Sequence, residues 1–264
     1  MPRHPLNPAP FQKAGTDAFG LPVAEPLQPA GGARAGVKAA RRSAGRRRGR
    51  RPRVVPYTVP WEGELPPLES AFVPRPGGGI AYPDEAPGDR YRDVLWARMT
   101  GDPGQGEPRF PDLHPGRQLA TMSRLLCQVC GGQASHTRDG TLFLFQTPTG
   151  PSEDLPHGPG PDWPEGVRTR QPPLCLRCAP IARAQCPHLQ DQCSAVRARS
   201  IRPVGACGTR FRTAGDRVVP VKSNVTLSFD APATRYLLGA QLLVTLHGTT
   251  VVNLDRELQR AGTR

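Results

Sequence analysis

The chain has 264 residues, room for one or two domains, but its 33 prolines and 29 glycines exclude helix and central strand from much of that length. Residues 1–53 hold twelve of the 35 basic and two of the 22 acidic residues, which leaves 23 against 20 for the rest, so the net charge of +13 belongs mainly to this segment. No apolar run approaches the roughly 18 residues of a membrane span, and no secretory signal is recognisable, so we expect a cytoplasmic protein with reduced thiols and no membrane contact.

Residues 1–53 show no apolar periodicity and end in an arginine-rich run, so we expect a disordered tail. The tail is either simply solvated or binds nucleic acid, because each arginine that neutralises a phosphate releases a counterion. No aromatic residue interrupts the run, so such contact would be to the backbone and blind to base sequence. The candidate nucleic-acid-binding residues are Arg41, Arg42, Arg46, Arg47, Arg48, Arg50, Arg51 and Arg53.

The next part of the chain contains short apolar stretches between prolines. We expect short strands or turns at residues 54–61, 80–85 and 91–99, since proline limits such pieces to the edges of a sheet. The aromatic side chains of this part favour core packing over a ligand cage.

A helix is expected to begin after His114-Pro115, because proline suits the first helical turn. The residues at helical spacing that predict its apolar face are Leu119, Met122 and Leu126. The residues on the opposite face, expected to lie in solvent, are Arg117, Thr121 and Arg124.

Between residues 140 and 186 we expect a buried strand, a long loop and a second helix. Thr141–Gln146 is a short apolar run, which predicts a strand that is buried on both faces. Residues 147–173 are rich in Pro and Gly and predict a loop that is either a mobile insertion or a recognition element. A helix should run from about Cys178 to Gln185, with Pro180 tolerated in its first turn.

The C-terminal part predicts a strand, a helix and a second strand. Val225–Phe229 is typical of a strand, and Asp230 ahead of Pro232 suits a helix N-cap. The helix would end at His247-Gly248, and its apolar face would consist of Tyr236, Leu237, Ala240, Leu243 and Val244. Val251–Leu254 would then return as a strand.

Two Cys-x-x-Cys pairs with 44 residues between them are the strongest chemical signal in the chain. Four thiolates can enclose a zinc ion tetrahedrally, and such closed sites are structural. Gly131-Gly132 would let the chain turn sharply behind the first pair, and the second pair opens a predicted helix whose dipole favours thiolate over thiol. We therefore predict a structural zinc ion bound by Cys127, Cys130, Cys175 and Cys178.

Other interpretations of the cysteines remain open. The two pairs could be unrelated reduced thiols, or one pair could be a redox dithiol, although neither lies in a thioredoxin-like setting. Cys186-Pro187-His188 could supply a substitute ligand or a second site, but its position favours a helix stop. Cys193 and Cys207 are expected to be unpaired small apolar residues.

These elements predict an α+β fold with a small, zinc-stabilised, treble-clef-like core, short strands and two or three helices, behind the disordered tail. The order of knuckle, hairpin and cysteine-bearing helix is that of treble-clef modules. The expected division is the tail at 1–53 and a single domain at 54–264, with the zinc module at about 115–190. A thin apolar core is expected there, so the zinc ion would decide whether the module folds.

Several runs resemble, in the same order, a family of uncharacterised actinomycete proteins: VLWAR, HPGRQ, LLCQVCGG, PPLCLRCA, CPHL and GAQLLVTLHGTTVVNLD. The resemblance covers about residues 54–258. It implies a common fold and shared cysteine pairs, and it implies that the basic tail and the Pro/Gly loop near 147–166 are additions of this chain. It supplies no function.

The sequence favours a non-enzymatic binding module, in which a zinc-stabilised domain contacts nucleic acid through the tail or another protein through the nearly charge-balanced remainder. The alternative is a treble-clef nuclease of the HNH kind, which needs a histidine base and a divalent-metal site. The region offers His136, Asp139 and His157 for this purpose, and no asparagine lies between residues 131 and 180. No P-loop, nucleophile elbow, H-E-x-x-H or dinucleotide-binding motif occurs.

Overall fold

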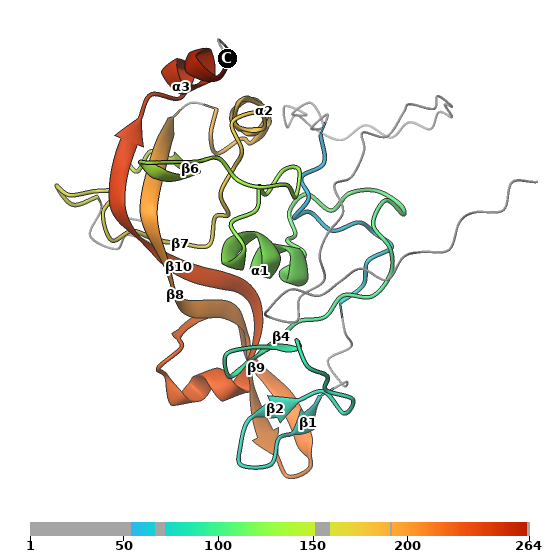
Figure 1. Ribbon diagram of the computed structural model, residues 1–264. Helices are drawn as coiled ribbons and strands as arrows, with labels where there is room; N and C mark the ends of the chain where they lie inside the picture. The colour runs from blue at the N-terminus through green and yellow to red at the C-terminus, as the bar shows by residue number, and fades with distance from the viewer. Residues whose placement is uncertain (1–53, 67–71, 151–158, 191, 263–264) are drawn as a thin grey trace, which may run out of the picture.

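The computed structural model describes residues 54–66, 72–150, 159–190 and 192–262. Two long strands, β8 (Cys193–Ala214) and β10 (Leu237–Val252), run side by side through most of the length of the molecule and curve as they do so (Figure 1). The arginine tail lies outside the described residues, so its disorder and its binding role stay predictions.

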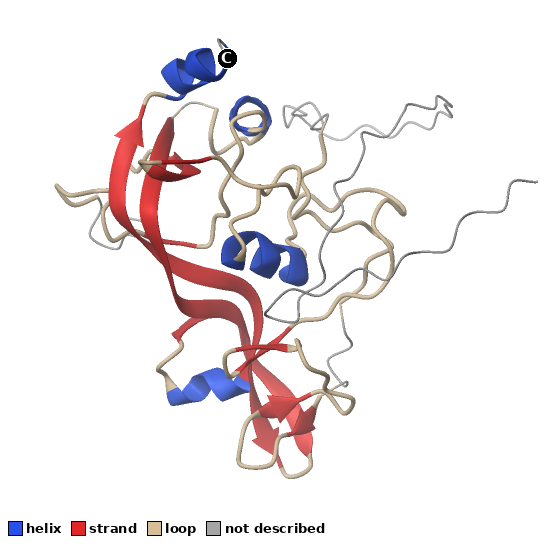
Figure 2. Ribbon diagram, in the orientation of Figure 1, coloured by secondary structure: helices blue, strands red, loops and turns tan. Residues whose placement is uncertain are grey.

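An eight-stranded sheet is built around these two strands, and a separate two-stranded sheet lies at one end (Figure 2). The order along the main path is β3-β4-β10-β8-β6-β5, while β7 pairs with β10 and β9 pairs with β8. The pairing of β4 with β10 is parallel and the others are antiparallel. The remaining strands are β1 (Val73–Pro74), β2 (Ile80–Ala81), β3 (Arg90–Tyr91), β4 (Val94–Trp96), β5 (His136–Thr137), β6 (Gly140–Gln146), β7 (Arg168–Thr169) and β9 (Arg217–Ser228).

The length of β8 follows from its succession of partners. It pairs with β6 at residues 193–198, with β10 at residues 195–210, and with β9 at residues 205–214. Gly208 is needed where three strands meet, because a Cβ atom there would lie 1.9 Å from the carbonyl oxygen of Leu238. The strand can therefore change partners without breaking.

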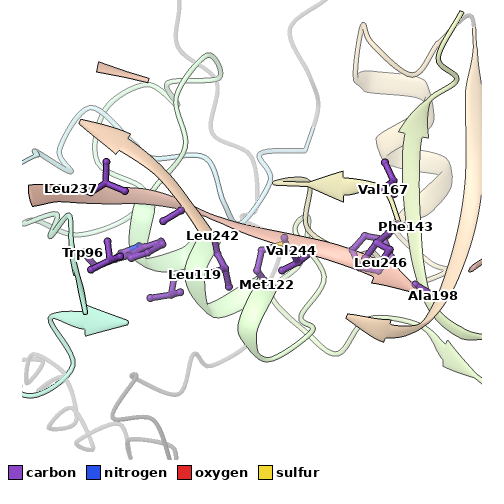
Figure 3. Packing of buried hydrophobic residues seen from close by; sticks show 12 residues of the cluster. Trp96, Leu119, Met122, Phe143, Val167, Ala198, Leu237, Leu242, Val244 and Leu246 are labelled. Carbon is purple, nitrogen blue, oxygen red and sulfur yellow. The ribbon is translucent and has the colours of Figure 1, made fainter. Parts of the chain in front are cut away.

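Helix α1 (Pro115–Ser123) begins at the predicted proline and packs against β10. Leu119 and Met122 insert among side chains of the sheet in a central cluster (Figure 3), whose buried members are Val94, Trp96, Leu119, Met122, Phe143, Val167, Ala198, Ala206, Leu237, Leu242, Val244 and Leu246. The fully buried amide of Gln118 also joins helix to sheet: its Oε1 accepts from Leu242 N at 2.7 Å and its Nε2 donates to Leu242 O at 3.3 Å. The helix and the Leu119 and Met122 part of its apolar face are thus confirmed, whereas Leu126 is buried but lies beyond the end of the helix.

The prediction that Arg117 and Thr121 face solvent is wrong. Both are buried, because residues 54–66 cover the second side of the helix. Arg117 pairs there with Glu64 at 2.5 Å, and the hydroxyl of Thr121 donates to helix carbonyls one turn back. Helical spacing alone could not show that a non-regular segment would cover this face.

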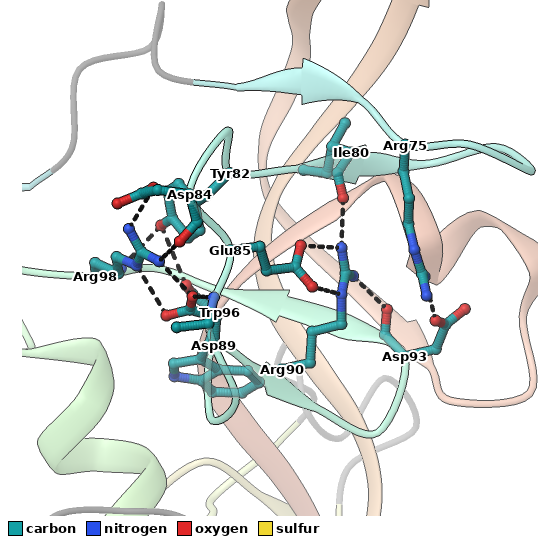
Figure 4. A network of polar contacts seen from close by, with 11 residues as sticks. Arg75, Ile80, Tyr82, Asp84, Glu85, Asp89, Arg90, Asp93, Trp96 and Arg98 are labelled. Atoms are coloured by element: carbon teal, nitrogen blue, oxygen red, sulfur yellow. Dashed lines mark hydrogen bonds and ion pairs between the residues drawn. The ribbon is translucent and has the colours of Figure 1, made fainter.

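The short strands or turns expected at 54–61, 80–85 and 91–99 are confirmed, with turns and one isolated bridge in the first piece and strands in the other two. Arginine–carboxylate pairs tie residues 75–98 together (Figure 4). Arg98 binds both Asp84 and Asp89, and Arg90 binds Glu85 with Nε–Oε1 at 2.7 Å. The guanidinium of Arg98 also lies 4.1 Å from the centre of the Tyr82 ring. The strands of this part are only two or three residues long, and ion pairs between side chains help to hold them together.

The predicted C-terminal helix is wrong, because Leu237–Val252 forms strand β10 and only Pro232–Tyr236 is helical, as the short 3-10 helix η2. A bulge between Gly239 and Gln241 adds Ala240 to β10, whereas the register shift between Leu243 and Val244 adds Val204 to β8. The bulge in β10, together with buried residues on both faces of the strand, makes apolar residues recur at spacings of three and four, which imitates a helix. Of the strand expected at Val251–Leu254, Val251 and Val252 form the end of β10, whereas Leu254 begins helix α3 (Leu254–Gly262).

The predicted α+β fold with a small treble-clef-like core is also wrong, since the described residues are 39% strand and 15% helix and are organised by one curved sheet. Strand β6 was expected inside a zinc module, but it pairs with β8 as an inner strand of that sheet. The second predicted helix is present as α2 (Ala179–Gln185). Among the described residues, no helix is long and apolar enough to cross a membrane.

Candidate metal centre

The first cysteine pair lies in a tight turn just after α1. The amide of Cys127 donates to Gly132 O at 2.6 Å, and the amide of Gly131 donates back to Cys127 O at 2.8 Å. Gly131 has a φ of +71°, and a Cβ atom at this position would lie 3.1 Å from the ring of Tyr57. Glycine therefore permits both the turn and the packing of residues 57–58 against it.

The second cysteine pair lies in the turn that leads into α2. The carbonyl of Cys175 accepts from the amides of Cys178 and Ala179, each at 3.1 Å. Cys178 is the N-cap residue of the helix, and its backbone is already in the helical region. Both sulfurs of this pair are thus fixed by the first turn of α2.

Backbone hydrogen bonds hold the two turns against each other. The amide of Gln128 donates to Pro173 O at 3.0 Å, and the amide of Ser135 donates to Leu174 O at 2.9 Å. Leu174 in turn donates to Leu142 O of β6 at 2.9 Å. The inner strand β6 therefore fixes both segments to the sheet, although they lie far apart in the sequence.

The structure brings together the four cysteines that the sequence singles out. The sulfurs of Cys127, Cys130, Cys175 and Cys178 all lie within 4.8 Å of one another, and those of Cys130 and Cys175 are 3.9 Å apart. A tetrahedral site with Zn–S bonds of about 2.3 Å places its sulfurs about 3.8 Å apart, whereas a disulfide needs about 2.05 Å. All four thiols are free, so the cluster could hold a metal ion, and the reading of two unrelated pairs is wrong.

Burial and mutual proximity oppose ionisation of these thiols when they are alone. The pKa of Cys127 is raised by its hydrogen bond with Cys175 and by burial, and burial together with the charge of Cys127 raises the pKa of Cys178 to about 12. The neighbouring Arg177 hydrogen-bonds to Cys130, which raises the pKa of its guanidinium. A divalent cation inverts this balance, because it binds thiolates and releases their protons.

The apolar surroundings of the centre form a cluster that contains no aromatic side chain among its buried members. We call it the metal-end cluster, and these members are Cys127, Val129, Leu142, Leu144, Leu174, Cys178, Ala179, Leu189, Ala195 and Leu254. Two of the four cysteines are therefore part of the core, and two lie at its edge.

The other three cysteines do not belong to the group of four sulfurs. Cys186 is the C-cap of α2, with its amide bonded to Ala182 O at 2.9 Å, which confirms the predicted helix stop. Cys193 and Cys207 are free thiols, as expected, and Cys207 is buried, where its thiol donates to Asn224 Oδ1 at 3.2 Å and Arg170 Nη1 lies 3.5 Å from its sulfur. His188 is exposed and belongs to no group of three or more potential ligands among the described residues.

A buried arginine that sequence reasoning missed joins the metal end to the C-terminal helix. Arg197 of β8 is fully buried and donates to Gly140 O at 2.8 Å and to Ser135 Oγ at 3.0 Å. Its Nε also donates to Glu257 Oε1 of α3 at 2.9 Å. An arginine within a strand gave no signal of this role, because its acidic partner lies 60 residues away.

A second buried charge cluster lies between residues 54–66 and the start of α1 and was also missed. Glu64 Oε2 accepts from the Trp61 amide at 2.8 Å and pairs with Arg117, and His114 Nε2 lies 3.6 Å from its other oxygen. His114 Nδ1 caps α1 by accepting from the Arg117 amide at 3.2 Å. Burial, with the nearby charge of Arg117, lowers the pKa of His114 to about 4, so the imidazole stays neutral and able to cap.

A cavity of about 710 Å³ lies beside the metal centre, between β6 and β7. Its wall includes Gln128 from the turn of the first cysteine pair. It also includes Arg168 of β7, Arg170 just after this strand, and the aromatic residues Phe145 and Trp163. Among the described residues, no carboxylate lines the cavity. Much of its wall comes from the loop predicted at 147–173, which contains β7 and of which residues 151–158 lie outside the description.

Among the residues that the structure describes, those proposed for a nuclease do not form a metal site. His136 is exposed on β5, with its Nδ1 3.0 Å from Thr141 Oγ1, and His157 lies outside the described residues. Within residues 54–66, 72–150, 159–190 and 192–262, the four cysteines are the one group of three or more His, Cys, Asp or Glu placed to hold a metal ion. The treble-clef scaffold on which the nuclease alternative depended is absent as well.

Comparison of the chain with protein-family models, with curated proteins and with solved structures finds no match.

Proposed function

We propose that this is a zinc-binding protein whose metal ion is structural, and that the folded part serves as a non-enzymatic module for binding a macromolecule. The observation that carries the proposal is the convergence of four sulfurs from two distant turns. A complete set of four thiolates leaves no open coordination position for substrate or water, which is typical of structural zinc. Two buried ligands and apolar surroundings support the same interpretation.

The arginine tail is proposed to add nucleic-acid contact that does not depend on base sequence. Eight arginines between residues 41 and 53 can neutralise phosphates, and the resulting affinity should fall steeply with salt. The remainder of the chain is nearly balanced in charge, so another protein is an equally acceptable partner for it.

Metal analysis of the purified full chain tests the first part of the proposal. We expect one zinc ion per chain, no iron, and no visible absorbance, since four thiolates also suit iron–sulfur sites. Cys175→Ala should lose the metal. The matched control is Cys193→Ala, which removes a thiol outside the cluster and should keep it. A metal-free wild type, or equal zinc in both variants, would count against the centre.

A binding assay tests the second part. Wild-type protein should bind mixed-sequence nucleic acid with a steep salt dependence, and replacing the tail arginines by glutamine should weaken that binding. A plasmid-nicking assay with magnesium or manganese addresses the nuclease alternative, and cleavage that His136→Ala abolishes would reverse our assignment.

A further inference from the structure

The hairpin of β8 and β9 extends beyond the rest of the sheet as a two-stranded ribbon. Arg210 is the last residue of β8 that pairs with β10, whereas pairing with β9 continues to Ala214. Gly215, with a φ of +64°, and Asp216 form the tip between the strands. This projection lies at the lower end of the molecule, next to β1 and β2 (Figure 1).

The two faces of this ribbon have opposite character. Phe211 is 4% exposed and belongs to the aromatic cluster, and Val218 packs against this cluster. Its buried members are Phe72, Ile80, Tyr82, Leu95 and Phe211. Side chains alternate along a strand, so residues 210 and 212 lie on the opposite face. We call this second face the basic face, and its charged residues are Arg210, Arg212, Arg217 and Lys222, all exposed.

The charges of the basic face are not balanced by the fold. Arg210 lies directly opposite Lys222 in the ladder, an arrangement of like charges that destabilises a strand pair. No ion pair joins any of the four residues to a carboxylate of the described part of the chain. The one acidic residue between 210 and 222 is Asp216, which is exposed at the tip. A polyanion would relieve the repulsion that the fold leaves in place.

We propose that the basic face of the β8–β9 ribbon is a docking surface for the backbone of duplex DNA. The proposal rests on the nucleic-acid contact of the proposed function and places part of that contact on the folded part. Arginines at alternate strand positions lie roughly 7 Å apart, so neighbouring side chains can reach successive phosphates of one groove wall.

Three features of the ribbon favour duplex DNA over other polyanions. The basic face has no aromatic side chain, so it lacks the stacking platform of proteins that bind single strands. A two-stranded ribbon fits the major groove of B-form DNA, whereas the major groove of A-form RNA is too deep and narrow to admit side chains. The arginines lie on a paired ribbon anchored through Phe211, so they are positioned before the DNA arrives.

The test uses the full chain and a fluorescein-labelled duplex of mixed sequence, with affinity measured by anisotropy across a salt series. The ribbon variant is R210Q/R212Q/K222Q, and the tail variant replaces Arg46, Arg47, Arg48, Arg50 and Arg51 by glutamine. The matched control R138Q/R202Q/R256Q removes three exposed basic residues elsewhere. The ribbon variant should bind about tenfold more weakly, and the slope of log K against log salt should become shallower by about 2.7, or 0.9 for each lost phosphate contact.

The outcomes separate the ribbon from the tail. The proposal is supported if each variant weakens binding, if the two variants combined abolish it, and if the control variant binds as tightly as the wild type. If the tail variant loses all binding and the ribbon variant none, the ribbon proposal is overturned while the tail keeps its role. A wild type that binds no nucleic acid overturns both.

Two further measurements guard against trivial explanations. Competition by single-stranded RNA or polyglutamate as effective as that of unlabelled duplex would overturn the choice of DNA. The ribbon variant should keep its zinc and melt at an unchanged or slightly higher temperature, because it loses the repulsion between Arg210 and Lys222. A lower melting temperature would mean that the basic residues serve the fold, and this too would overturn the proposal.

Discussion

The two ends of β8 and β10 belong to one sheet but are stabilised by different chemistry. At the end near α3, the metal-end cluster contains no aromatic side chain among its buried members, and the four thiols and the buried Arg197 lie within or beside it. At the opposite end, Phe72, Tyr82 and Phe211 pack together with ring centroids 5.1 and 5.2 Å apart. The comparison teaches that one sheet can be stabilised by thiols and a buried ion pair at one end and by packed aromatic rings at the other.

The largest effect is expected from removing the metal at the cross-linked end. Cys175→Ala should lower the melting temperature strongly, since a structural zinc contributes about 10–16 kcal/mol in finger peptides. Hydrogen exchange should show lost amide protection around residues 127–145, with residues 205–228 still protected. If amide protection were lost uniformly across the sheet, or not at all, the two ends would not be stabilised separately.

Glu257→Ala should destabilise the same end without touching the cysteines. It leaves the fully buried Arg197 without its carboxylate, and breaking a buried pair in this way costs about 3–5 kcal/mol. Denaturant unfolding with zinc content measured in parallel checks this. Asp255→Asn is the control, because the partly exposed pair between Asp255 and Arg183 should contribute under about 1 kcal/mol.

Phe211→Ala should weaken the aromatic end by a comparable amount. Truncating a buried phenylalanine costs about 3–5 kcal/mol, because apolar contacts are lost and a cavity remains. Here the protection around residues 205–228 should fall while zinc content and the protection of residues 127–145 stay unchanged. Loss of zinc from this variant would contradict the separation of the two ends.

His114, the N-cap residue of α1, should make the free energy of unfolding depend on pH. Its folded pKa of about 4 lies below the ordinary 6.5, so its contribution to stability is present above pH 6.5 and is lost as pH falls toward 4. The loss should be roughly 3 kcal/mol, since one pKa unit corresponds to about 1.4 kcal/mol. In His114→Asn the cap acceptor is kept without a titrating group, and its unfolding free energy should fall less over this range. If the unfolding free energies of the wild type and His114→Asn fell in parallel with pH, His114 would not be the source of the pH dependence.

The smallest effect is expected from the exposed ion pairs of the aromatic end. Asp93→Asn removes the partner of Arg75, but both side chains are more than one third exposed, so the change should stay below about 1 kcal/mol. Thermal melts at low and high salt would measure it. A loss above 2 kcal/mol would show that the network in Figure 4 acts as a unit and not as separate surface pairs.

The sequence predicted those parts of the molecule whose cause is local. The start of α1 at Pro115, the strand at β6, the helix α2 and its stop at Cys186 each depend on a few neighbouring residues. The four cysteines belong to the same class, because spacing within each pair suggests a shared ligand. The convergence of the pairs depended on β6, whose pairing with β8 no local pattern indicated.

The parts that failed depend on distant partners. Strand β10 contains a bulge at Ala240 that forms only in its pairing with β8, and its apolar spacing therefore imitated a helix. Strand β8 was not predicted, since Pro203, two glycines and five arginines obscure its alternation. The buried pairs of Arg197 with Glu257 and of Arg117 with Glu64 join residues 60 and 53 positions apart, and charge in a sequence is ordinarily a sign of exposure.

The unbroken course of β8 limits how this protein can change in length. One added or lost residue near Gly205 would turn every later side chain to the other face, which would expose Phe211 and carry Arg210 and Arg212 into the apolar side. The tip at Gly215-Asp216 has no such constraint, because both strands could lengthen together there. Kindred chains should therefore differ in how far the ribbon reaches and agree in the residue count between Arg197 and Phe211.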